Sequence, residues 1–284
     1  MNIVASIPEM RDWSDGVRRE GHTIGLVPTM GALHHGHASL MRAARAACDR
    51  VVVSLFVNPT QFGPQEDFER YPRVFDADRA LCEREGVDAL FHPSVAEMYP
   101  PGAETTVDVG PLGTVLCGAS RPGHFRGVAT VVTKLFAIVN PHRAYFGRKD
   151  YQQTAVIRRL VLDLRLGVEV VVCPTVRDAD GLAASSRNAY LSPEDRKNAL
   201  RVPAALAEAA RQIASGERSV GKIREAMEVI LTGESGIRVD YVALVDPDTL
   251  QPVDRPAGRV VAAVAVWVGA TRLIDNAVIE VEHG

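Results

Sequence analysis

An apolar stretch, a glycine-containing turn and a helical pattern follow one another near the start of the chain. Residues 24–27 form a short run typical of a buried strand, and residues 38–48 carry apolar side chains at helical spacing. Between them, residues 28–37 read Pro-Thr-Met-Gly-Ala-Leu-His-His-Gly-His. A strand that ends in such a turn and opens a helix directs free backbone N–H groups and a positive dipole end at one point. The segment therefore predicts a phosphate-binding turn.

Two histidines strengthen this interpretation. His34 and His37 lie three residues apart at the start of the predicted helix, and Gly36 between them lets the backbone approach a phosphate closely. An imidazole can donate a hydrogen bond to a phosphate oxygen as negative charge moves toward the leaving group. We therefore expect chemistry on a nucleotide phosphate, with His34 and His37 as catalytic residues.

Composition narrows the class of protein. The chain has 284 residues, of which 46% are hydrophobic and 24% charged, ordinary values for a globular protein with one large domain or two modest ones. Its formal net charge of −3 gives no basic surplus, whereas proteins that bind nucleic acid usually carry a clustered one. We therefore expect no nucleic-acid partner.

The cysteines and the longest apolar run point to a soluble, cytoplasmic protein. No Cys-x-x-Cys pair occurs, so buried reduced thiols are expected rather than a zinc site or a disulfide framework. Residues 260–268 form the longest apolar run, about half of the roughly 20 residues that span a bilayer. The N-terminal residues lack the pattern of a secretory signal, and no membrane partner is expected. The four cysteines are Cys48, Cys82, Cys117 and Cys173.

Strand-like and helix-like segments alternate through the first two thirds of the chain. The continuous β-branched run at residues 51–57 is typical of a strand buried in a parallel sheet. Alternation of this kind predicts an α/β fold, a Rossmann-like doubly wound parallel sheet with sites at the carboxyl ends of its strands. The predicted strands are residues 24–27, 51–57, 87–91, 144–146 and 168–173, and the predicted helices are 38–48, 76–85, 127–139 and 151–164.

Beyond residue 174 the pattern changes. Two alanine-rich helical patterns come first, and three strand-like stretches then complete the chain, which predicts a smaller C-terminal α+β domain. We expect residues 1–175 to form the Rossmann-like domain and residues 176–284 the smaller one. The helical patterns cover residues 193–215 and 220–232, and the strand-like stretches cover 239–245, 259–268 and 272–281.

Several segments resemble a known family. The pattern His-x-Gly-His after an apolar strand is the signature of the nucleotidylyltransferase superfamily, and the longer string at residues 28–37 resembles the pantoate–β-alanine ligase family. The resemblance covers nearly the whole chain. The other matching segments are Phe-Val-Asn-Pro-Thr-Gln-Phe at 56–62, Tyr-Pro-Arg at 71–73, His-Phe-Arg-Gly-Val at 124–128, Phe-Gly-Arg-Lys-Asp-Tyr-Gln-Gln at 146–153 and Ser-Ser-Arg-Asn at 185–188.

The resemblance implies an ATP-dependent condensation in two steps. The carboxylate of pantoate attacks the α-phosphorus of ATP to give pantoyl adenylate and pyrophosphate, and the amine of β-alanine then displaces AMP to give pantothenate. No protein nucleophile is needed, and the chain offers no persuasive Ser-His-Asp or Cys-His arrangement. The resemblance also implies Mg²⁺ with the ATP, a homodimer, and a smaller domain that acts as a lid.

The same resemblance implies roles for individual residues. Lys149 joins the two histidines as a catalytic residue, Gln61 and Gln153 bind pantoate or β-alanine, and Asp78 is the position associated with Mg²⁺. His35 and Ala184 depart from the family, which usually has an acidic residue and a larger apolar residue there. The residues implied to bind ATP are Met30, Gly31, Ala32, Leu33, His34, His35, Gly36, His37, Gly147, Arg148, Lys149, Asp150, Val176, Ala184, Ser185, Ser186 and Arg187.

Some of these positions can also be interpreted without the family. A Gly-x-Lys-Asp sequence at the end of a strand suits a cation placed against phosphates. Amide side chains can bind a hydroxyl or a carboxylate without carrying charge. Arg121 and His124, just before the helix predicted at 127–139, either contact phosphate or cap that helix. Val128, Val131 and Val132 fit a pocket wall and core packing equally well.

Two other functions stay open from the sequence. One is a different adenylyl- or cytidylyltransferase that joins the nucleotide permanently to its substrate. The other is a non-catalytic nucleotide-binding or RNA-binding module on the same fold. Release of free AMP separates the ligase from the first, and retention on nucleic acid at physiological salt would favour the second.

Overall fold

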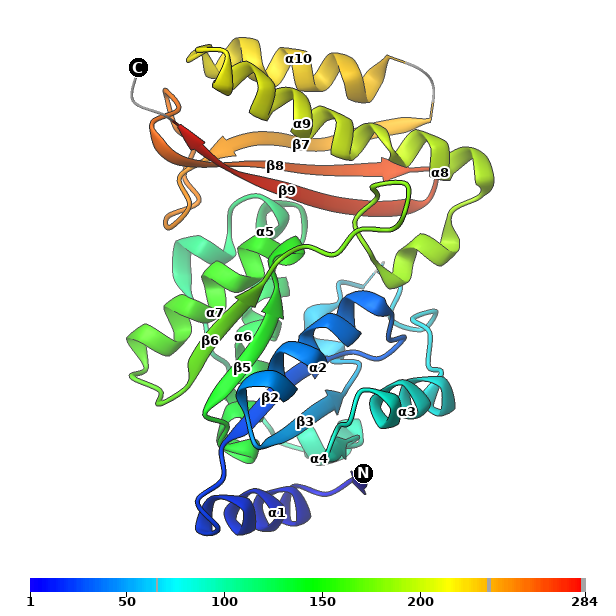
Figure 1. Cartoon of the computed structure of the whole chain (residues 1–284), viewed down its shortest axis with the longest axis vertical. Coiled ribbons are helices and arrows are strands. Elements are labelled where there is room, and N and C mark those ends of the chain that lie inside the picture. Colours follow the sequence, from blue (N-terminus) through cyan, green and yellow to red (C-terminus); the bar gives the residue numbers. More distant parts are fainter. Residues whose placement is uncertain (65, 234–235, 282–284) are drawn as a thin grey trace. The chain divides into compact units, whose positions relative to one another are not determined.

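The computed structural model describes residues 1–64, 66–233 and 236–281, which form two compact units (Figure 1). The first unit comprises Met1–Thr114, Arg121–Arg148 and Val156–Pro174. The second comprises Val115–Ser120, Lys149–Ala155 and the described residues from Thr175 onward. Two short segments that precede residue 174 thus belong with the second unit, and neither is marked by its composition.

The first unit is built on a six-stranded parallel sheet. Its strand order is β1-β4-β3-β2-β5-β6, and each neighbouring pair is parallel. Helices alternate with these strands along the chain, so the predicted doubly wound α/β class is confirmed. The strands are β1 Asn2–Val4, β2 Ile24–Thr29, β3 Arg50–Leu55, β4 Ala89–Phe91, β5 Arg143–Gly147 and β6 Glu169–Cys173.

Helices cover both faces of this sheet, which explains why its central strands are apolar throughout. On one face, Leu40, Met41 and Ala44 of α2 pack against Val51 and Val53 of β3, and α3 lies beside α2. On the other face, α1 and α6 contact each other and β2. The five longer helices are α1 Ile7–Arg19, α2 His35–Ala47, α3 Phe75–Arg84, α6 His124–Val139 and α7 Tyr151–Asp163.

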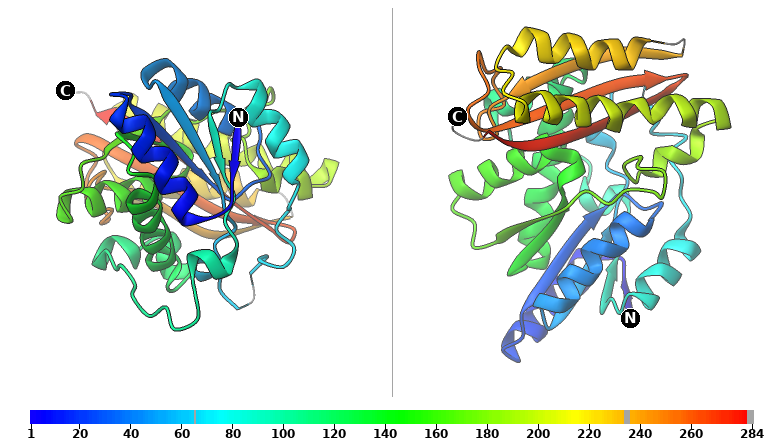
Figure 2. Two further views of the ribbon diagram at one scale, coloured as in Figure 1. Left: turned by 90° about the horizontal axis from the view of Figure 1, so that it is seen from below. Right: turned by 45° about the horizontal axis from the view of Figure 1, so that its top comes forward.

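The second unit pairs a three-stranded antiparallel sheet with helices. The strand order is β7-β8-β9, and the right panel of Figure 2 shows α9 and α10 lying along one face. Alternate residues of β8 pack against these helices in an apolar core that includes Leu206, Ile223 and Val264. The elements are α8 Pro193–Ala199, α9 Arg201–Ala214, α10 Val220–Thr232, β7 Ile237–Val245, β8 Gly258–Val268 and β9 Thr271–Val281.

Short helical turns connect the longer elements. Each of them has three to five residues, and two of them follow the carboxyl ends of β3 and β5. No helix among the described residues combines the length and the hydropathy needed to cross a membrane. The turns are η1 Pro59–Gln61, α4 Val95–Met98, η2 Gly110–Gly113, α5 Cys117–Ser120, η3 Arg148–Asp150 and η4 Ser186–Tyr190.

Candidate functional site

The turn that follows β2 is shaped by backbone conformations that glycine tolerates. Gly31 has φ +88° and Ala32 has φ 51°, both in the left-handed region. The Thr29 hydroxyl donates to the carbonyl of Ser54 at 2.7 Å and accepts the N–H of Gly31 at 3.3 Å. The end of β2 is thereby tied to β3, and the chain is directed into the first turn of α2.

A buried carboxylate also fixes the turn that follows β2. The Asp78 carboxylate accepts the N–H of Ala32 at 2.9 Å and the N–H of Leu33 at 2.7 Å, one on each oxygen. Asp78 is only 3% exposed, and a Cβ at Gly31 would lie 3.0 Å from its Oδ2. Burial raises the pKa of Asp78, while the hydrogen bonds from Leu33 and Ala32 oppose the rise. Asp78 therefore acts as an anchor for the turn that carries the two histidines.

The imidazoles of His34 and His37 have defined proton positions. The Nδ1 atom of His34 accepts the N–H of Gly36 at 3.1 Å, and the Nδ1 atom of His37 accepts the N–H of His34 at 3.2 Å. A ring nitrogen that accepts a backbone N–H carries no proton, so the neutral rings hold their proton on Nε2. The ring centroids are 4.1 Å apart. The start of α2 thus carries two adjacent Nε2–H donors in addition to its backbone N–H groups.

This position is the switch point of the sheet. Strand β2 lies between β3 and β5, and the register pairs Gly25 with Arg143 and Leu26 with Ala144. Ligands of doubly wound sheets bind outside the carboxyl ends of the strands at such a point. The turn after β2 and Gly147 at the end of β5 both occupy this edge of the sheet, as the sequence predicts.

Gln61 ends the short turn η1 in the same unit and is 9% exposed. Its Nε2 lies 3.1 Å from the sulfur of Met30. Arg121 and His124 both hydrogen-bond to the backbone oxygen of Gln61, at 3.3 Å and 2.8 Å. Arg121 also pairs with Glu66 at 2.5 Å. Arg121 and His124 thus hold the backbone beside Gln61, and the two roles left open for them stay predictions.

Three valines of α6 lie in the interior, and whether they also form a pocket wall stays a prediction. Val128, Val131 and Val132 are buried. Gly127 precedes them, and a Cβ there would lie 2.3 Å from the carbonyl oxygen of Thr60. Only a glycine allows α6 to approach η1 this closely, which brings the helix against the segment that carries Gln61.

Lys149 lies in the second unit, where β9 fixes its backbone. The Asn276 side chain donates to the carbonyl oxygen of Lys149 at 2.8 Å. The Lys149 ammonium lies 3.8 Å from the Asp150 carboxylate and is largely buried. Asn276 is opposite Ala263 in the register of β8 and β9, on the sheet face away from the Val264 core.

The two adjacent glutamines of α7 have different environments. Gln152 is buried, accepts the N–H of Cys117 at 3.0 Å and donates to the carbonyl of Val115 at 2.7 Å. Its amide therefore holds the 115–120 segment. Among the described residues Gln153 has no side-chain hydrogen bond, and its role in binding a substrate stays a prediction.

The loop that carries Ser185, Ser186 and Arg187 is held by charged pairs. Arg196 of α8 pairs with Asp178 at 2.7 Å and with Asp180 at 2.8 Å. The Ala184 N–H donates to the carbonyl of Val176 at 2.9 Å, and Ser185 Oγ accepts the Arg187 N–H at 3.3 Å.

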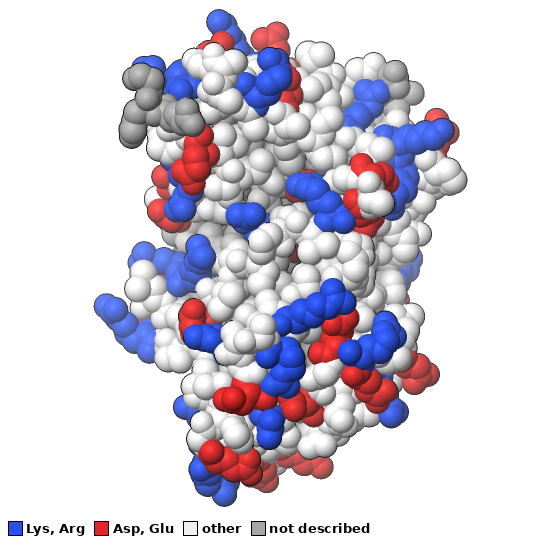
Figure 3. Space-filling model, viewed as in Figure 1, with Lys and Arg blue, Asp and Glu red and all other residues white. Residues whose placement is uncertain are grey.

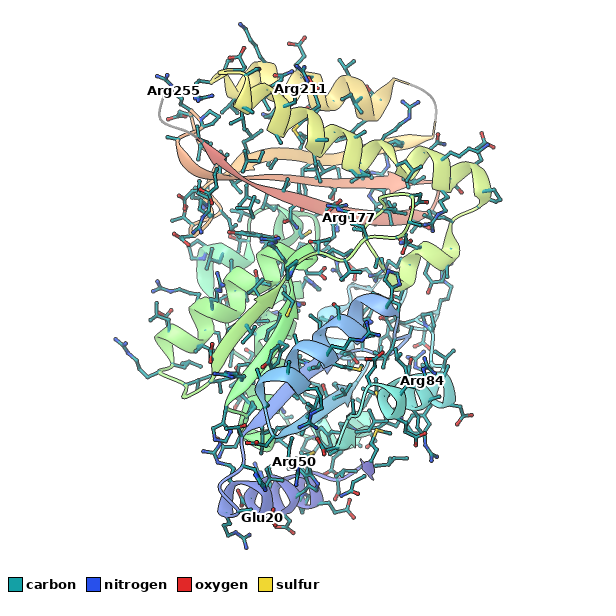
Figure 4. The ribbon with its side chains drawn as sticks, viewed as in Figure 1. Glu20, Arg50, Arg84, Arg177, Arg211 and Arg255 are labelled. Atoms are coloured by element: carbon teal, nitrogen blue, oxygen red, sulfur yellow. The ribbon has the colours of Figure 1, made fainter. Side chains whose placement is uncertain are left out.

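Arg177, labelled in Figure 4, ties the loop to the sheet of the same unit. It pairs with Asp275 of β9 at 2.7 Å, and Asp275 is almost fully buried. The start of the loop is therefore fixed to the strand that also holds Lys149.

Sequence reasoning missed several residues that support these groups. Asn58 and Tyr99 contact each other beside Gln61, and Glu66 holds Arg121. Asn58 belongs to the matching segment at 56–62, which was the available signal, whereas nothing in the sequence marks Tyr99. The four cysteines are buried and free, as expected. On the face of the molecule drawn in Figure 3, acidic and basic side chains are interspersed, without a continuous basic area.

A strand–turn–helix at the switch point of a parallel sheet, with two imidazole donors at the helix start, defines an α/β nucleotide-binding protein of the His-x-Gly-His class. Comparison with known proteins narrows the class. The family model described as pantoate-beta-alanine ligase matches residues 2–278, and the chain belongs to this family.

Curated relatives match over their full length. The pantothenate synthetase of Thermotoga neapolitana is 57% identical over 279 residues, which cover 98% of this chain and 100% of the relative. That of Moorella thermoacetica is 57% identical over 281 residues, with 99% of each chain covered.

Solved structures of the family share the fold. The crystal structure of pantothenate synthetase from Thermus thermophilus has a TM-score of 0.93 at 49% identity, with both chains fully covered. Pantoate-beta-alanine ligase from Francisella tularensis, complexed with beta-gamma ATP and beta-alanine, has a TM-score of 0.81 at 35% identity, covering 100% of this chain and 99% of that one.

Proposed function

We propose that this protein condenses pantoate with β-alanine at the expense of ATP, through a pantoyl-adenylate intermediate. The carboxylate of pantoate attacks the α-phosphorus and releases pyrophosphate; the amine of β-alanine then attacks the acyl carbon and releases AMP. The observation that carries the proposal is the pair of Nε2–H donors at the start of α2 in a chain that belongs to the pantoate-beta-alanine ligase family. The relative crystallised with beta-gamma ATP and beta-alanine supports the choice of substrates.

His34 and His37 stabilise the charge that develops on the phosphates. Their Nδ1 atoms are committed to backbone N–H groups, so each ring offers Nε2–H and keeps a fixed orientation. Donors that are already oriented need no rearrangement as the pyrophosphate leaves, which is the condition for electrostatic catalysis. The residues from Met30 to His37 bind the triphosphate through the turn and the start of α2.

The remaining ATP contacts come from residues 147–150 and from the loop that follows β6. Lys149 is the cation that acts on the phosphates in the first step, with Gly147, Arg148 and Asp150 in the same segment. Val176, Ala184, Ser185, Ser186 and Arg187 bind ATP through the loop that follows β6. Only backbone contacts are expected from Ala184, because its side chain is a single methyl group.

Gln61 and Gln153 bind pantoate or β-alanine through their uncharged amides. Gln61 is buried beside Met30, and Gln153 has an uncommitted side chain among the described residues. Amides of this kind can recognise hydroxyl and carboxylate oxygens without adding charge to the site.

Mg²⁺ is proposed to enter with ATP and to be held mainly by phosphate oxygens. No cluster of three or more His, Cys, Asp or Glu side chains suited to a metal occurs in the described part of the chain, and a phosphate-bound Mg²⁺ needs only one or two protein carboxylates. Asp78 fits such a role: each of its oxygens accepts one backbone N–H and retains a lone pair. When bound, the ion would neutralise charge on the triphosphate.

The smaller unit is proposed to act as a lid, with its loop at Ser185–Arg187 ordered by the phosphates of bound ATP. Such ordering would keep water from the acyl adenylate, which otherwise hydrolyses. A homodimer and a cytoplasmic location are further parts of the proposal, and they rest on the family.

The test measures pyrophosphate and AMP release from ATP and pantoate, with and without β-alanine. We expect pyrophosphate from ATP and pantoate alone, and AMP with pantothenate only when β-alanine is added. Pyrophosphate without any AMP would instead identify a nucleotidylyltransferase that keeps the nucleotide on its product. No turnover at all, together with retention of nucleic acid at physiological salt, would favour a binding module.

A further inference from the structure

The side-chain amide of Asn58 has only one possible orientation. Its Oδ1 accepts the backbone N–H of Thr60 at 3.3 Å, and its Nδ2 donates to the backbone carbonyl of Gly127 at 3.1 Å. A backbone N–H can only donate and a backbone carbonyl can only accept. Rotating the amide by 180° would therefore place donor against donor and acceptor against acceptor. Asn58 is 1% exposed, so water cannot relieve that mismatch.

Two hydroxyl groups reinforce this orientation. Tyr99 Oη donates to Asn58 Oδ1 at 2.9 Å, and Thr60 Oγ1 donates to the same oxygen at 2.9 Å. The pKa of Tyr99 is raised by burial, with a smaller opposing effect of Thr60, so the phenol keeps its proton at neutral pH.

Tyr99 is itself held from two sides. The Lys134 ammonium lies 4.4 Å from the centre of its ring and donates to the carbonyl of Met98 at 2.7 Å, while Phe56 packs 6.2 Å away, centroid to centroid. These contacts fix the place from which the phenol hydroxyl reaches Asn58.

The orientation of the Asn58 amide also determines the orientation of the Gln61 amide. The Nδ2 group of Asn58 donates to Gln61 Oε1 at 3.1 Å. The oxygen end of the Gln61 amide is thus committed to Asn58, and its NH₂ end faces the sulfur of Met30 at 3.1 Å, a weak acceptor that a better one can replace.

We propose that Tyr99 is a positioning residue of the pantoate site, which acts through Asn58 to hold the Gln61 amide with its NH₂ group toward the substrate. The inference rests on the proposed role of Gln61 and adds the direction of the hydrogen bond. The subsite takes an oxygen that accepts, such as a hydroxyl or carboxylate oxygen of pantoate, and excludes an ammonium group.

The main experiment is a double-mutant cycle on the full-length protein. Tyr99→Phe removes only the hydroxyl and keeps the ring between Lys134 and Phe56. We expect the KM for pantoate to rise about three- to tenfold, the range of a single neutral hydrogen bond, with kcat and the KM for ATP changed less than about twofold. In a Gln61→Met background, the same substitution is expected to leave the KM for pantoate unchanged, because the two residues act as one unit.

Tyr145→Phe is the matched control. Tyr145 is a buried tyrosine of β5 in the same unit, and its hydroxyl lies 3.5 Å from the sulfur of Cys48, with no link to Asn58. The KM of the Tyr145→Phe variant for pantoate is expected to equal that of the wild type. An equal rise for Tyr99→Phe with and without Gln61, or no rise at all, would overturn the inference.

A second readout does not depend on turnover. In ¹H–¹⁵N spectra, the Gln61 side-chain NH₂ signals, assigned by their loss in Gln61→Met, are expected to move downfield when pantoate is added to the wild type, and less so in Tyr99→Phe. Unmoved signals with pantoate demonstrably bound would contradict a donor role. If the wild type binds no pantoate, the proposed function is wrong. If the wild type binds pantoate and the Gln61 signals of Tyr99→Phe move as far as those of the wild type, only the inference about Tyr99 is wrong.

Discussion

The two units hold their proposed ATP-binding segments by different physical means. In the first unit, the buried Asp78 carboxylate accepts two backbone N–H groups of the turn before α2. In the second, the loop at residues 178–187 is held by Arg196, a partly exposed cation paired with Asp178 and Asp180. A buried anion with backbone donors is little affected by dissolved salt, whereas exposed pairs are screened within about 10 Å at 0.1 M salt.

This difference assigns different mechanical properties to the two segments. A turn held by a desolvated carboxylate is costly to displace, which suits groups that must be in place before the substrate arrives. A loop held by screened ion pairs can exchange those partners for the charge of a ligand, because each pair contributes little on its own. We therefore expect the first unit to be preorganised and the loop of the second to respond to ATP.

The histidine variants test the preorganised turn and should give the largest effect. Replacing His37 or His34 with Ala removes an oriented donor, and adenylate formation is expected to fall about 10²-fold or more. The measurement is pantoate-dependent exchange of pyrophosphate into ATP. His22→Ala is the control, because that partly exposed ring lies near Glu20 and outside the turn. Near-normal exchange in His37→Ala would refute the phosphate assignment.

Lys149→Ala tests the contribution of the second unit. Loss of a charged hydrogen-bond donor is expected to slow the first half-reaction about ten- to a hundredfold, while pantoyl adenylate supplied directly is converted at close to the normal rate. Single-turnover rates of the two half-reactions provide the measurement, with the exposed Lys222→Ala as a control. Equal losses in both half-reactions would indicate a structural role for Lys149 instead.

Asp78→Asn tests the buried anchor. An amide can offer only one oxygen to the two N–H groups of Ala32 and Leu33, so one donor faces an NH₂ group and loses its partner. We expect a loss of stability of about 1–3 kcal/mol, measured by urea unfolding, and slower adenylate formation. Asp76→Asn, an exposed position in the same turn of α3, should change neither. A raised Mg²⁺ requirement at unchanged stability would show that Asp78 acts on the metal rather than on the turn.

Arg196→Gln tests the ionic anchor and should give the smallest effect. Hydrogen bonds from Arg196, and then from the N–H of Leu182, lower the pKa of Asp180. A lowered pKa in the folded state means that the contribution to stability is present above the unfolded pKa and is lost as pH falls through the folded value. The melting temperatures of wild type and variant should therefore differ slightly at about pH 7 and low salt, and converge below about pH 4 or at about 1 M NaCl. A difference that persists under both conditions would show that Arg196 does not act through charge.

The sequence predicted the elements whose side-chain pattern is regular. The run predicted at 51–57 corresponds to β3, because a strand covered on both faces is apolar throughout. The spacing of Leu40, Met41 and Ala44 corresponds to the face of α2 that lies in the core. The helix predicted at 193–215 is divided in the structure: α8 ends before Leu200 and α9 follows. Pro203 has no N–H to donate to the carbonyl of residue 199, which explains the break.

Other features could not be predicted. Some elements are too short to give a clear sequence pattern, and some contacts join residues that are far apart in the sequence. The strand β1 has three residues, and α1 contains Pro8, which resembles an interruption although proline fits the first turn of a helix. The positions of His34 and His37 could be predicted, because a sequence with glycine and histidine in this pattern indicates a turn. The hydrogen bond between Asn58 and Tyr99 joins residues 41 positions apart, and a single sequence contains no record of such a pairing.

The burial of all four native thiols has a practical consequence for spectroscopy. Burial raises the pKa of Cys82 to about 12 and also raises that of Cys173, and protonated, enclosed thiols react slowly with labelling reagents. Leu162 in the first unit and Val229 in the second are exposed large side chains. A Leu162→Cys, Val229→Cys double variant would therefore accept a spin-label pair with little labelling of the native thiols. The distribution of distances between the labels, with and without an ATP analogue, would test whether the two units move when the nucleotide binds.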